Sequence, residues 1–168
     1  LLIVSIRSYG GYVHHNQVYV DSKHPLHVKN QVSGELLFLQ KRTRRFVDEV
    51  CRVYPKNKAV QRLANWSGDL RELRFNTDHI LASNTNKGEV ISVCLVDREG
   101  RLNARNDVMW VLLHELAHVM TSQYRHDDEF WKHNRFLVKE AVKMGYYDYT
   151  SYTKTPKKFC GSVIRYNF

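Results

Sequence analysis

The stretch that decides the fold runs from Val108 to Met120 and reads Val-Met-Trp-Val-Leu-Leu-His-Glu-Leu-Ala-His-Val-Met. Ten of its 13 residues are apolar, and the exceptions are His114, Glu115 and His118. A segment that is apolar nearly all the way round predicts a buried helix, and it is too short and too interrupted to span a bilayer. Burying two imidazoles and a carboxylate without partners costs several kcal/mol, so the sequence predicts that something binds them.

The spacing of these three polar residues predicts a zinc centre. His114 and His118 are four residues apart, so on a helix they lie on one face, one turn above the other. Two neutral imidazoles held in this way can bind one Zn²⁺ ion. Glu115 is rotated by about 100° from His114, so it can act as a general base on a water without being a ligand. This is the H-E-x-x-H pattern of metallopeptidases. A structural zinc site would usually have four protein ligands, often cysteines, and the three cysteines here are widely separated.

A catalytic zinc site takes a third protein ligand and leaves the fourth position open. We expect the third ligand to be His126. Residues 121–125 are polar and lack apolar periodicity, so the helix should end there, and Asp127 or Asp128 can cap the next helix. The chain can then turn back and present His126 just before that helix. The other candidates, which this spacing leaves open, are His133, Glu129 and Glu140.

The sequence His-Glu-Leu-Ala-His, followed by His126-Asp-Asp-Glu-Phe-Trp131, resembles the WLM family of zinc metalloproteases and their SprT-like and YgjP-like relatives. The resemblance is closest to WLM-like proteins of large DNA viruses, covers roughly residues 83–161, and includes two further motifs. These are an Asn-Lys-Gly-Glu turn at Asn86–Glu89 and a tail with Asp148-Tyr149, Pro156 and Cys160-Gly161. The gap from His118 to His126 is longer than in typical WLM proteins.

The resemblance implies an α+β, zincin-like metalloprotease fold, in which a small, mostly antiparallel sheet packs on the active-site helix. It also implies a bound Zn²⁺ ion, with His126 as the third ligand, and an extended substrate that pairs with an edge strand. The expected hairpin joins 80–85 and 90–96 through the Asn86–Gly88 turn.

The remaining patterns divide one expected zincin-like domain into segments. These are N-terminal strands and turns in 1–30, helices in 31–66, strands in 73–96, the active-site helix in 104–122, a second helix in 127–145 and a Tyr-rich tail in 146–168. Short β-prone runs are expected at 17–20, 26–28 and 73–75. An amphipathic helix is expected from Ser33, as its N-cap, to Tyr54, and Asn103 or Asn106 can cap the active-site helix. The outer face of the first helix is basic and carries Lys41, Arg42, Arg44, Arg45 and Arg52.

The composition is that of a globular protein with a basic surface. Of its 168 residues, 43% are hydrophobic and 26% charged, which predicts one domain, and we expect a monomer. The net charge of +9 favours an anionic partner, and the basic helix face is the candidate for DNA contact. The N-terminal run Leu1–Ile6 could be a buried strand and is too short to cross a membrane. No membrane contact is therefore expected of this sequence, although it leaves open whether an apolar anchor precedes Leu1.

The three cysteines are Cys51, Cys94 and Cys160. An odd, sparse set without a C-x-x-C pair argues against a disulfide framework and favours an intracellular, reducing compartment. A minor alternative, which the sequence does not favour, is that Cys160 approaches the cleft and that its thiolate is a zinc ligand in a latent form.

Together these patterns predict a zinc-dependent metallopeptidase. Its three zinc ligands are His114, His118 and His126, and Glu115 moves the proton from water to the leaving amine. The resemblance implies proteolysis of DNA-crosslinked proteins, and a viral member could instead process virion or host proteins. The alternatives are a metal-dependent nuclease or hydrolase with a three-histidine site, and a non-catalytic, zinc-stabilised nucleic-acid-binding module. Glu115 argues against both, because neither needs a carboxylate directly after the first histidine.

Overall fold

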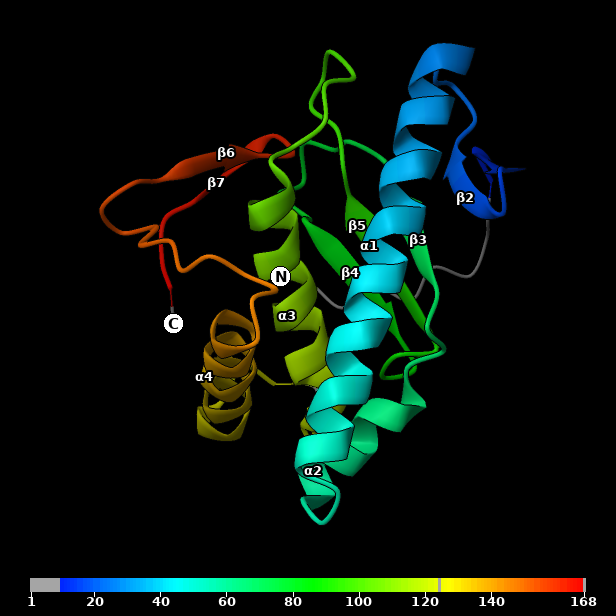
Figure 1. Cartoon of the computed structure of the whole chain (residues 1–168). Helices are drawn as coiled ribbons and strands as arrows, with labels where there is room; N and C mark the ends of the chain where they lie inside the picture. The colour runs from blue at the N-terminus through cyan, green and yellow to red at the C-terminus, as the bar shows by residue number, and fades with distance from the viewer. Residues whose placement is uncertain (1–9, 124, 168) are drawn as a thin grey trace.

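Two helices, one long and amphipathic and one almost wholly buried, determine the arrangement seen in Figure 1. The computed structural model describes residues 10–123 and 125–167. In chain order the elements are β1 (Tyr12–His15), β2 (Val18–Asp21), α1 (Leu26–Val53), α2 (Lys58–Gln61), a 3-10 turn (Arg62–Asn65), β3 (Leu70–Leu73), β4 (Ala82–Thr85), β5 (Val90–Cys94), α3 (Arg105–Met120), α4 (Asp128–Lys143), β6 (Lys157–Phe159) and β7 (Ser162–Ile164). The predicted α+β class is confirmed. The expected strand at Leu1–Ile6 lies outside the described residues.

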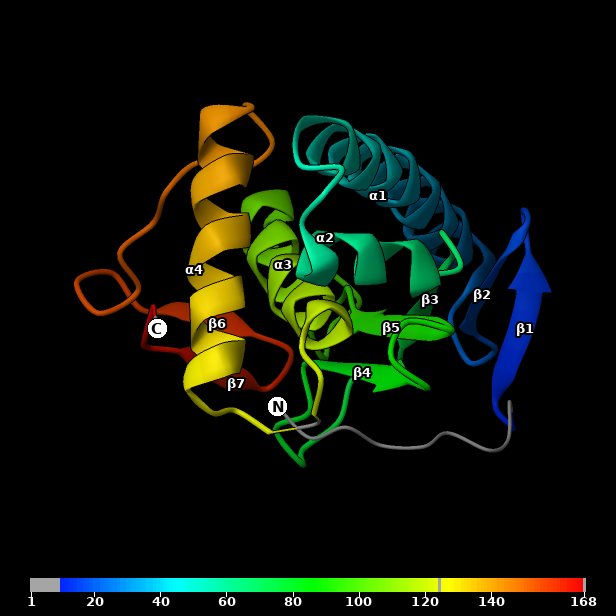
Figure 2. The same ribbon diagram turned by 90° about the horizontal axis from the view of Figure 1, so that it is seen from below.

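The described strands form three small sheets rather than the single sheet expected. The central sheet has the order β3-β5-β4, with β5 parallel to β3 and antiparallel to β4. Strands β1 and β2 form one antiparallel hairpin, and β6 and β7 form another. Figure 2 shows α1 and α3 on the same side of the central sheet. Helix α3 contacts β4 and β5, which places the H-E-x-x-H segment against the sheet.

The predicted β4–β5 hairpin is confirmed, and its turn packs tightly. Asn86, Lys87 and Gly88 all have positive φ angles, and that of Gly88 is 106°. A β-carbon on Gly88 would lie 3.0 Å from a methyl carbon of Val119 and 3.1 Å from the Cα of Trp66. Only glycine therefore fits between the end of α3 and the 3-10 turn.

Helix α3 confirms the prediction of a buried helix within 104–122. Every residue from Asp107 to Met120 is buried. The predicted caps are wrong, because the N-cap is Ala104 and forms no side-chain cap hydrogen bond. The amide of Asn106 instead donates to the backbone oxygen of Asp148, at 2.8 Å, and so ties α3 to the C-terminal tail.

Helix α1 starts earlier than expected. It begins at Leu26, directly after Pro25, so the strand expected at 26–28 is the first helical turn and pairs with nothing in a sheet. Pro25 has φ −58°, which already suits a helix start. Ser33 lies inside the helix, where its hydroxyl donates to the backbone oxygen of Asn30 at 3.1 Å. Apolar spacing continues N-terminally through the buried Val28 and Val32, and this outweighs the capping signal of Ser33.

The strand expected at 73–75 lies instead at Leu70–Leu73. The tail at 146–168 contains the β6–β7 hairpin, which the sequence pattern did not predict. Cys160 lies in the turn of this hairpin and forms a disulfide with Cys94 at the end of β5, with 6.1 Å between their Cα atoms. The expectation of unpaired cysteines is therefore wrong for this pair, since two distant segments meet here, and Cys51 is free. Among the described residues, no helix has the length and apolarity needed to cross a bilayer.

Candidate metal centre

Three histidine nitrogens converge at the C-terminal half of α3. The Nε2 atom of His126 lies 3.2 Å from that of His114 and 3.1 Å from that of His118. Nitrogens bound at about 2.0–2.1 Å to one tetrahedral Zn²⁺ ion lie about 3.3 Å apart, so the spacing fits such an ion. Within the described ranges, these histidines are the group of His, Cys, Asp and Glu side chains that could hold a metal ion.

The end of α3 fixes where the chain turns toward His126. The backbone of Thr121 becomes extended, and its hydroxyl donates to the oxygen of Ala117 at 2.7 Å. Two cations hold the last carbonyl groups: Arg62 donates to the oxygen of Met120 at 2.7 Å, and Lys87 donates to that of Thr121 at 2.6 Å. Positive charge at a helix C-terminus is favourable, because the last carbonyl groups carry partial negative charge.

The loop that carries His126 is anchored on both sides. The carboxylate of Glu129 accepts hydrogen bonds from the backbone N–H of Ser122, at 3.0 Å, and from its hydroxyl, at 2.8 Å. Asp127 caps α4, as expected, by accepting from the N–H of Phe130 at 3.1 Å. His126 therefore sits between two fixed points and is brought back to the face of α3.

The other candidates for the third ligand have different partners. Glu129 binds Ser122, and the Nε2 atom of His133 lies 3.7 Å from a carboxylate oxygen of Glu129. Glu140 accepts a hydrogen bond from the hydroxyl of Tyr54 at 2.7 Å. None of the three belongs to the histidine cluster. That His126 is the third ligand remains a prediction, and the geometry is compatible with it.

Aromatic rings surround the three imidazoles. The ring of Phe130 lies 4.7 Å from that of His114, 4.3 Å from that of His118 and 4.8 Å from that of His126, between centroids. Trp131 stacks on His126 with 5.8 Å between ring centroids. Burial lowers the pKa of His118 to about 3 and that of His114 well below its usual range. The imidazoles are therefore neutral at physiological pH and have lone pairs for a metal.

Glu115 is a buried carboxyl group beside this cluster in the sequence. Its side-chain oxygen Oε2 is buried and has no hydrogen-bond partner in the described part of the chain. Burial raises the pKa of Glu115 to about 8, although a hydrogen bond from Asn84 partly offsets this. A divalent cation on the histidines would favour the ionised form of Glu115 and so counteract the effect of burial. The donor set and the uncompensated carboxyl group both fit a resident metal ion.

A cleft of about 370 Å³ opens next to the histidines. His114 and His126 form part of its lining, and the other lining residues are Leu81, Trp110, Trp131, Val163, Ile164, Arg165 and Tyr166. Sequence analysis missed most of this wall. Trp110 could have been found, because it lies one helical turn before His114 on the same face. Val163–Tyr166 gave no local signal, because the tail reaches the cleft only through the fold.

Two tyrosines of the tail lie in the core, whereas Tyr166 is exposed and lines the cleft. Tyr147 and Tyr152 are both buried, and the hydroxyl of Tyr152 donates to Asp107 at 2.8 Å. Tyr152 also makes an edge contact with Trp110, with 5.2 Å between ring centroids. Cys160 cannot ligate a metal while it is bonded to Cys94, so its alternative role as a latent ligand is wrong for this structure.

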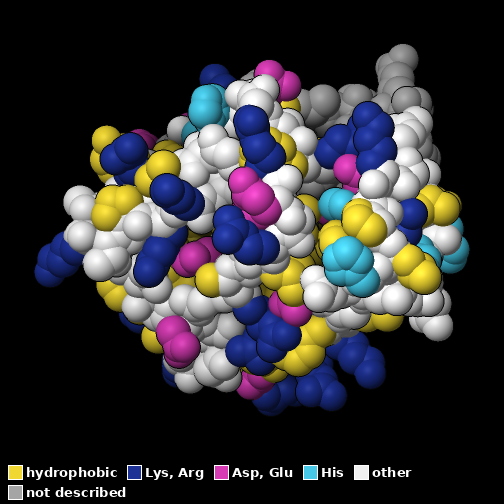
Figure 3. All heavy atoms as spheres, turned by 90° about the horizontal axis from the view of Figure 1, so that it is seen from above, with side chains coloured by type: hydrophobic (Ala, Val, Ile, Leu, Met, Phe, Trp, Pro, Cys, Tyr) yellow, Lys and Arg dark blue, Asp and Glu magenta, His cyan; other side chains and the backbone are white. Residues whose placement is uncertain are grey.

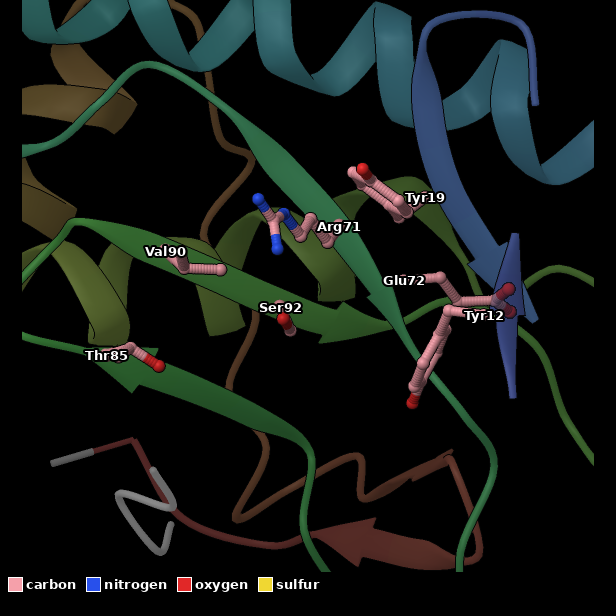
Figure 4. Close-up of a pocket in the computed structure, with 7 residues that line it drawn as sticks. All are labelled: Tyr12, Tyr19, Arg71, Glu72, Thr85, Val90 and Ser92. Atoms are coloured by element: carbon pink, nitrogen blue, oxygen red, sulfur yellow. The ribbon is translucent and has the colours of Figure 1, made fainter. Parts of the chain in front are cut away.

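A second polar cluster lies between the N-terminal hairpin and the sheet. Its small pocket is lined by Tyr12, Tyr19, Arg71, Glu72, Thr85, Val90 and Ser92 (Figure 4). Its volume is about 30 Å³, which suits one water but no substrate. Nearby, Glu72 accepts hydrogen bonds from the N–H of Asp21, at 2.7 Å, and from His24, at 2.8 Å. These contacts assign the cluster to structure rather than catalysis.

Comparisons with known proteins match the part of the chain that contains the three histidines. The sequence model of the WLM domain matches residues 37–167. An uncharacterized protein of Acanthamoeba polyphaga mimivirus is 39% identical over 79 residues, which are 46% of this chain and 40% of that protein. An uncharacterized protein of Invertebrate iridescent virus 3 is 41% identical over 61 residues, or 36% of this chain and 38% of that protein. The chain thus matches less than half the length of either viral relative. No solved structure matches it.

Proposed function

Because the chain belongs to the WLM domain family, which is associated with metalloprotease activity, we propose that it is a zinc-dependent metallopeptidase with a zincin-like fold. The observation that carries the proposal is the convergence of the three histidine Nε2 atoms, from α3 and the following loop, on one point. A buried glutamate directly after the first histidine supports hydrolysis rather than a purely structural site.

In this proposal each residue of the centre has one task. His114, His118 and His126 hold the ion through Nε2. Zinc, when bound there, polarises the scissile carbonyl group and lowers the pKa of water. The Glu115 carboxylate accepts the proton of the attacking water and delivers it to the nitrogen of the leaving amine. The aromatic rings of Phe130 and Trp131 keep the imidazoles in place and limit access of bulk water.

The position of β4 supports the zincin-like arrangement. β4 is an outer strand of the central sheet, and the amide of Asn84 donates to the backbone oxygen of Glu115 at 3.1 Å. This contact ties the strand directly to the H-E-x-x-H segment of α3. The expected pairing of an extended substrate with this strand stays a prediction, because Ala82, Ser83 and Asn84 are buried in the structure.

We also propose that the substrates are proteins associated with or crosslinked to DNA. The net charge of +9 supports contact with a polyanion, and Lys and Arg side chains are spread over the face in Figure 3, with Asp and Glu between them. On α1, Arg44 pairs with Asp69 at 2.8 Å, and Arg42 donates to the oxygen of Gly145 at 3.0 Å. The other cations on the basic outer face of α1 are exposed and are the candidates for phosphate contact. They are Lys41, Arg45 and Arg52.

The test measures cleavage of a basic DNA-binding protein by wild type and by Glu115→Gln, with and without single-stranded DNA. Zinc content is measured in parallel. We expect about one zinc per chain in both proteins and at least about a 100-fold lower rate for Glu115→Gln. Cleavage that depends on DNA would support the crosslink-related substrate class. Cleavage of the nucleic acid itself would favour a nuclease, and absence of zinc would contradict the proposal.

A further inference from the structure

We propose that the cleft beside the histidines selects peptide bonds that are flanked by one large apolar side chain, such as Leu, Met or Phe. This inference rests on the proposed peptidase function and names its substrate class. The cleft has about 370 Å³ and opens directly onto His114 and His126. Its volume lies in the range of small-ligand pockets and it is an open cleft, so it can accept one large side chain.

The chemistry of the wall is predominantly apolar. Leu81 and Trp110 are each 8% exposed and Ile164 is 4% exposed, so packing holds most of each side chain and the part that remains open lines the cleft. Trp131 and Val163 complete the apolar surface. A large apolar side chain that enters this cleft leaves water for a surface that offers few hydrogen bonds, which favours it over a small or polar side chain.

The charge of the lining further limits which substrate side chains the cleft can accept. The lining within the described residues includes one cation, the exposed Arg165, and no carboxylate. A Lys or Arg side chain in the cleft would therefore lose its hydration without gaining an opposite charge. We expect basic residues to be excluded from this position.

The wall is held rigidly, so its shape can discriminate. Trp110 is fixed by its edge contact with Tyr152, and Tyr152 is itself hydrogen-bonded to Asp107. Ile164 ends β7, which pairs with β6 in register Lys157↔Ile164. The disulfide of Cys160 then ties this hairpin to β5. A preorganised pocket loses little entropy on binding, which strengthens the preference for a matching side chain.

The experiment combines a cleavage profile with a binding measurement. The zinc-loaded 168-residue chain is incubated with a mixed peptide library, and the residues on each side of every cleaved bond are identified by mass spectrometry. Zinc-loaded Glu115→Gln is titrated with two matched peptides that carry Phe or Lys at the selected position. We expect one flanking position to be enriched in large apolar residues, by about 10- to 100-fold in kcat/KM, and the Phe peptide to bind more tightly.

Substitutions of Ile164 test whether this wall of the cleft determines the preference for large apolar side chains. Ile164→Ala should broaden it, and Ile164→Phe should shift it toward smaller apolar residues, because the added ring fills the cleft. Val53→Ala, which truncates an apolar side chain that is 44% exposed on α1, is the control and should change nothing. Zinc content and Tm of each variant show whether it is folded. If Ile164→Ala is unstable, Ile164→Phe and the peptide titration still test the side-chain preference of the cleft.

Failure of this inference differs from failure of the proposed function. Cleavage without enrichment at any flanking position, together with equal binding of the Phe and Lys peptides, would overturn the inference and leave the peptidase intact. Absence of cleavage together with tighter binding of the Phe peptide would contradict the peptidase and retain the apolar cleft. Absence of cleavage together with equal binding would overturn both.

Discussion

At the scale of single residues, His126 is the proposed ligand whose assignment depends most on the fold. Its Nε2 atom lies within 3.2 Å of both other ligand nitrogens. We expect His126→Ala to weaken zinc binding at least about 10- to 100-fold, because two ligands remain of three. His133→Ala is the matched control, since His133 contacts Glu129 rather than the cluster. Competition with a chromogenic chelator measures both affinities. Loss of zinc in the control, but not in His126→Ala, would reverse the assignment.

Asp21 gives the stability a defined dependence on pH. Its carboxylate accepts two hydrogen bonds from Arg74, both at 2.9 Å. Burial raises the pKa of Asp21, but the bonds from Arg74 and from the N–H of Lys23 outweigh this, so the net pKa is lowered. A lowered pKa stabilises the fold above the unfolded value of about 3.9, and this contribution is lost as pH falls through the folded value.

Replacing Asp21 by Asn should therefore lower the free energy of unfolding by about 1–3 kcal/mol near neutral pH. The difference from wild type should be smaller at about pH 3, which lies below the unfolded pKa of about 3.9, because the linked stability is lost as pH falls. Urea unfolding at both pH values measures this. A difference that stays constant with pH would mean that the ionised pair contributes nothing.

The convergence of the three histidines at the candidate metal centre could be predicted because their signal is local. The spacing of His114 and His118 fixes their relation through the geometry of one helix, and the capping signal of Asp127 places the residue before it. The wall of the cleft could not be predicted in the same way. Leu81 and Ile164 are more than 80 residues apart and meet at the cleft only because the tail packs against α3.

At the scale of elements, the disulfide fixes the β6–β7 hairpin to the sheet. Cys94 and Cys160 are 66 residues apart in sequence, so the bond closes a long loop. Cys160→Ser should lower the free energy of unfolding by about 2–4 kcal/mol. Cys51→Ser, at the free and half-buried cysteine, is the control and should have a smaller effect. Denaturant unfolding without reductant measures both variants. Equal stability of wild type with and without reductant would mean that the bond does not form in solution.

Two glycines should respond in opposite directions to the same substitution. Gly88→Ala should destabilise the protein by about 1–3 kcal/mol, because φ is 106° and the new methyl group would press on Val119 and Trp66. Gly34→Ala in α1 meets no atom within 4 Å and should stabilise it by about 0.5–1 kcal/mol. Thermal unfolding of the two variants provides the comparison. Two changes of the same sign would contradict the described turn.

Element boundaries were predictable where one signal dominated. The β4–β5 hairpin has both alternation and a glycine turn, and α3 has an uninterrupted apolar run. The start of α1 had competing signals, because Ser33 resembles a cap while the apolar stripe extends back to Val28. The parallel pairing of β3 with β5 could not be predicted, since it depends on how distant segments return to the sheet.

At the scale of the whole molecule, the metal should stabilise the fold without being needed to form it. A continuous buried core joins α1, α3, α4 and the central sheet, so the chain does not resemble small domains that fold only around zinc. Binding to the folded state alone adds stability by mass action, about 2.7 kcal/mol when free ligand is 100 times Kd. We therefore expect chelation to lower Tm by several degrees while the far-UV circular dichroism at room temperature is unchanged.

The His114→Ala variant provides the control for this effect, because it lacks one of the three converging nitrogens. Its Tm should respond much less to chelator than that of wild type and should lie closer to that of chelated wild type, apart from the small cavity left by the ring. Titrating zinc back into chelated wild type should restore the original Tm, since the histidines are already neutral and converging in the folded chain. Unfolding on chelation would show that the core alone does not hold the structure, and an unchanged Tm in both proteins would show that the histidines hold no ion.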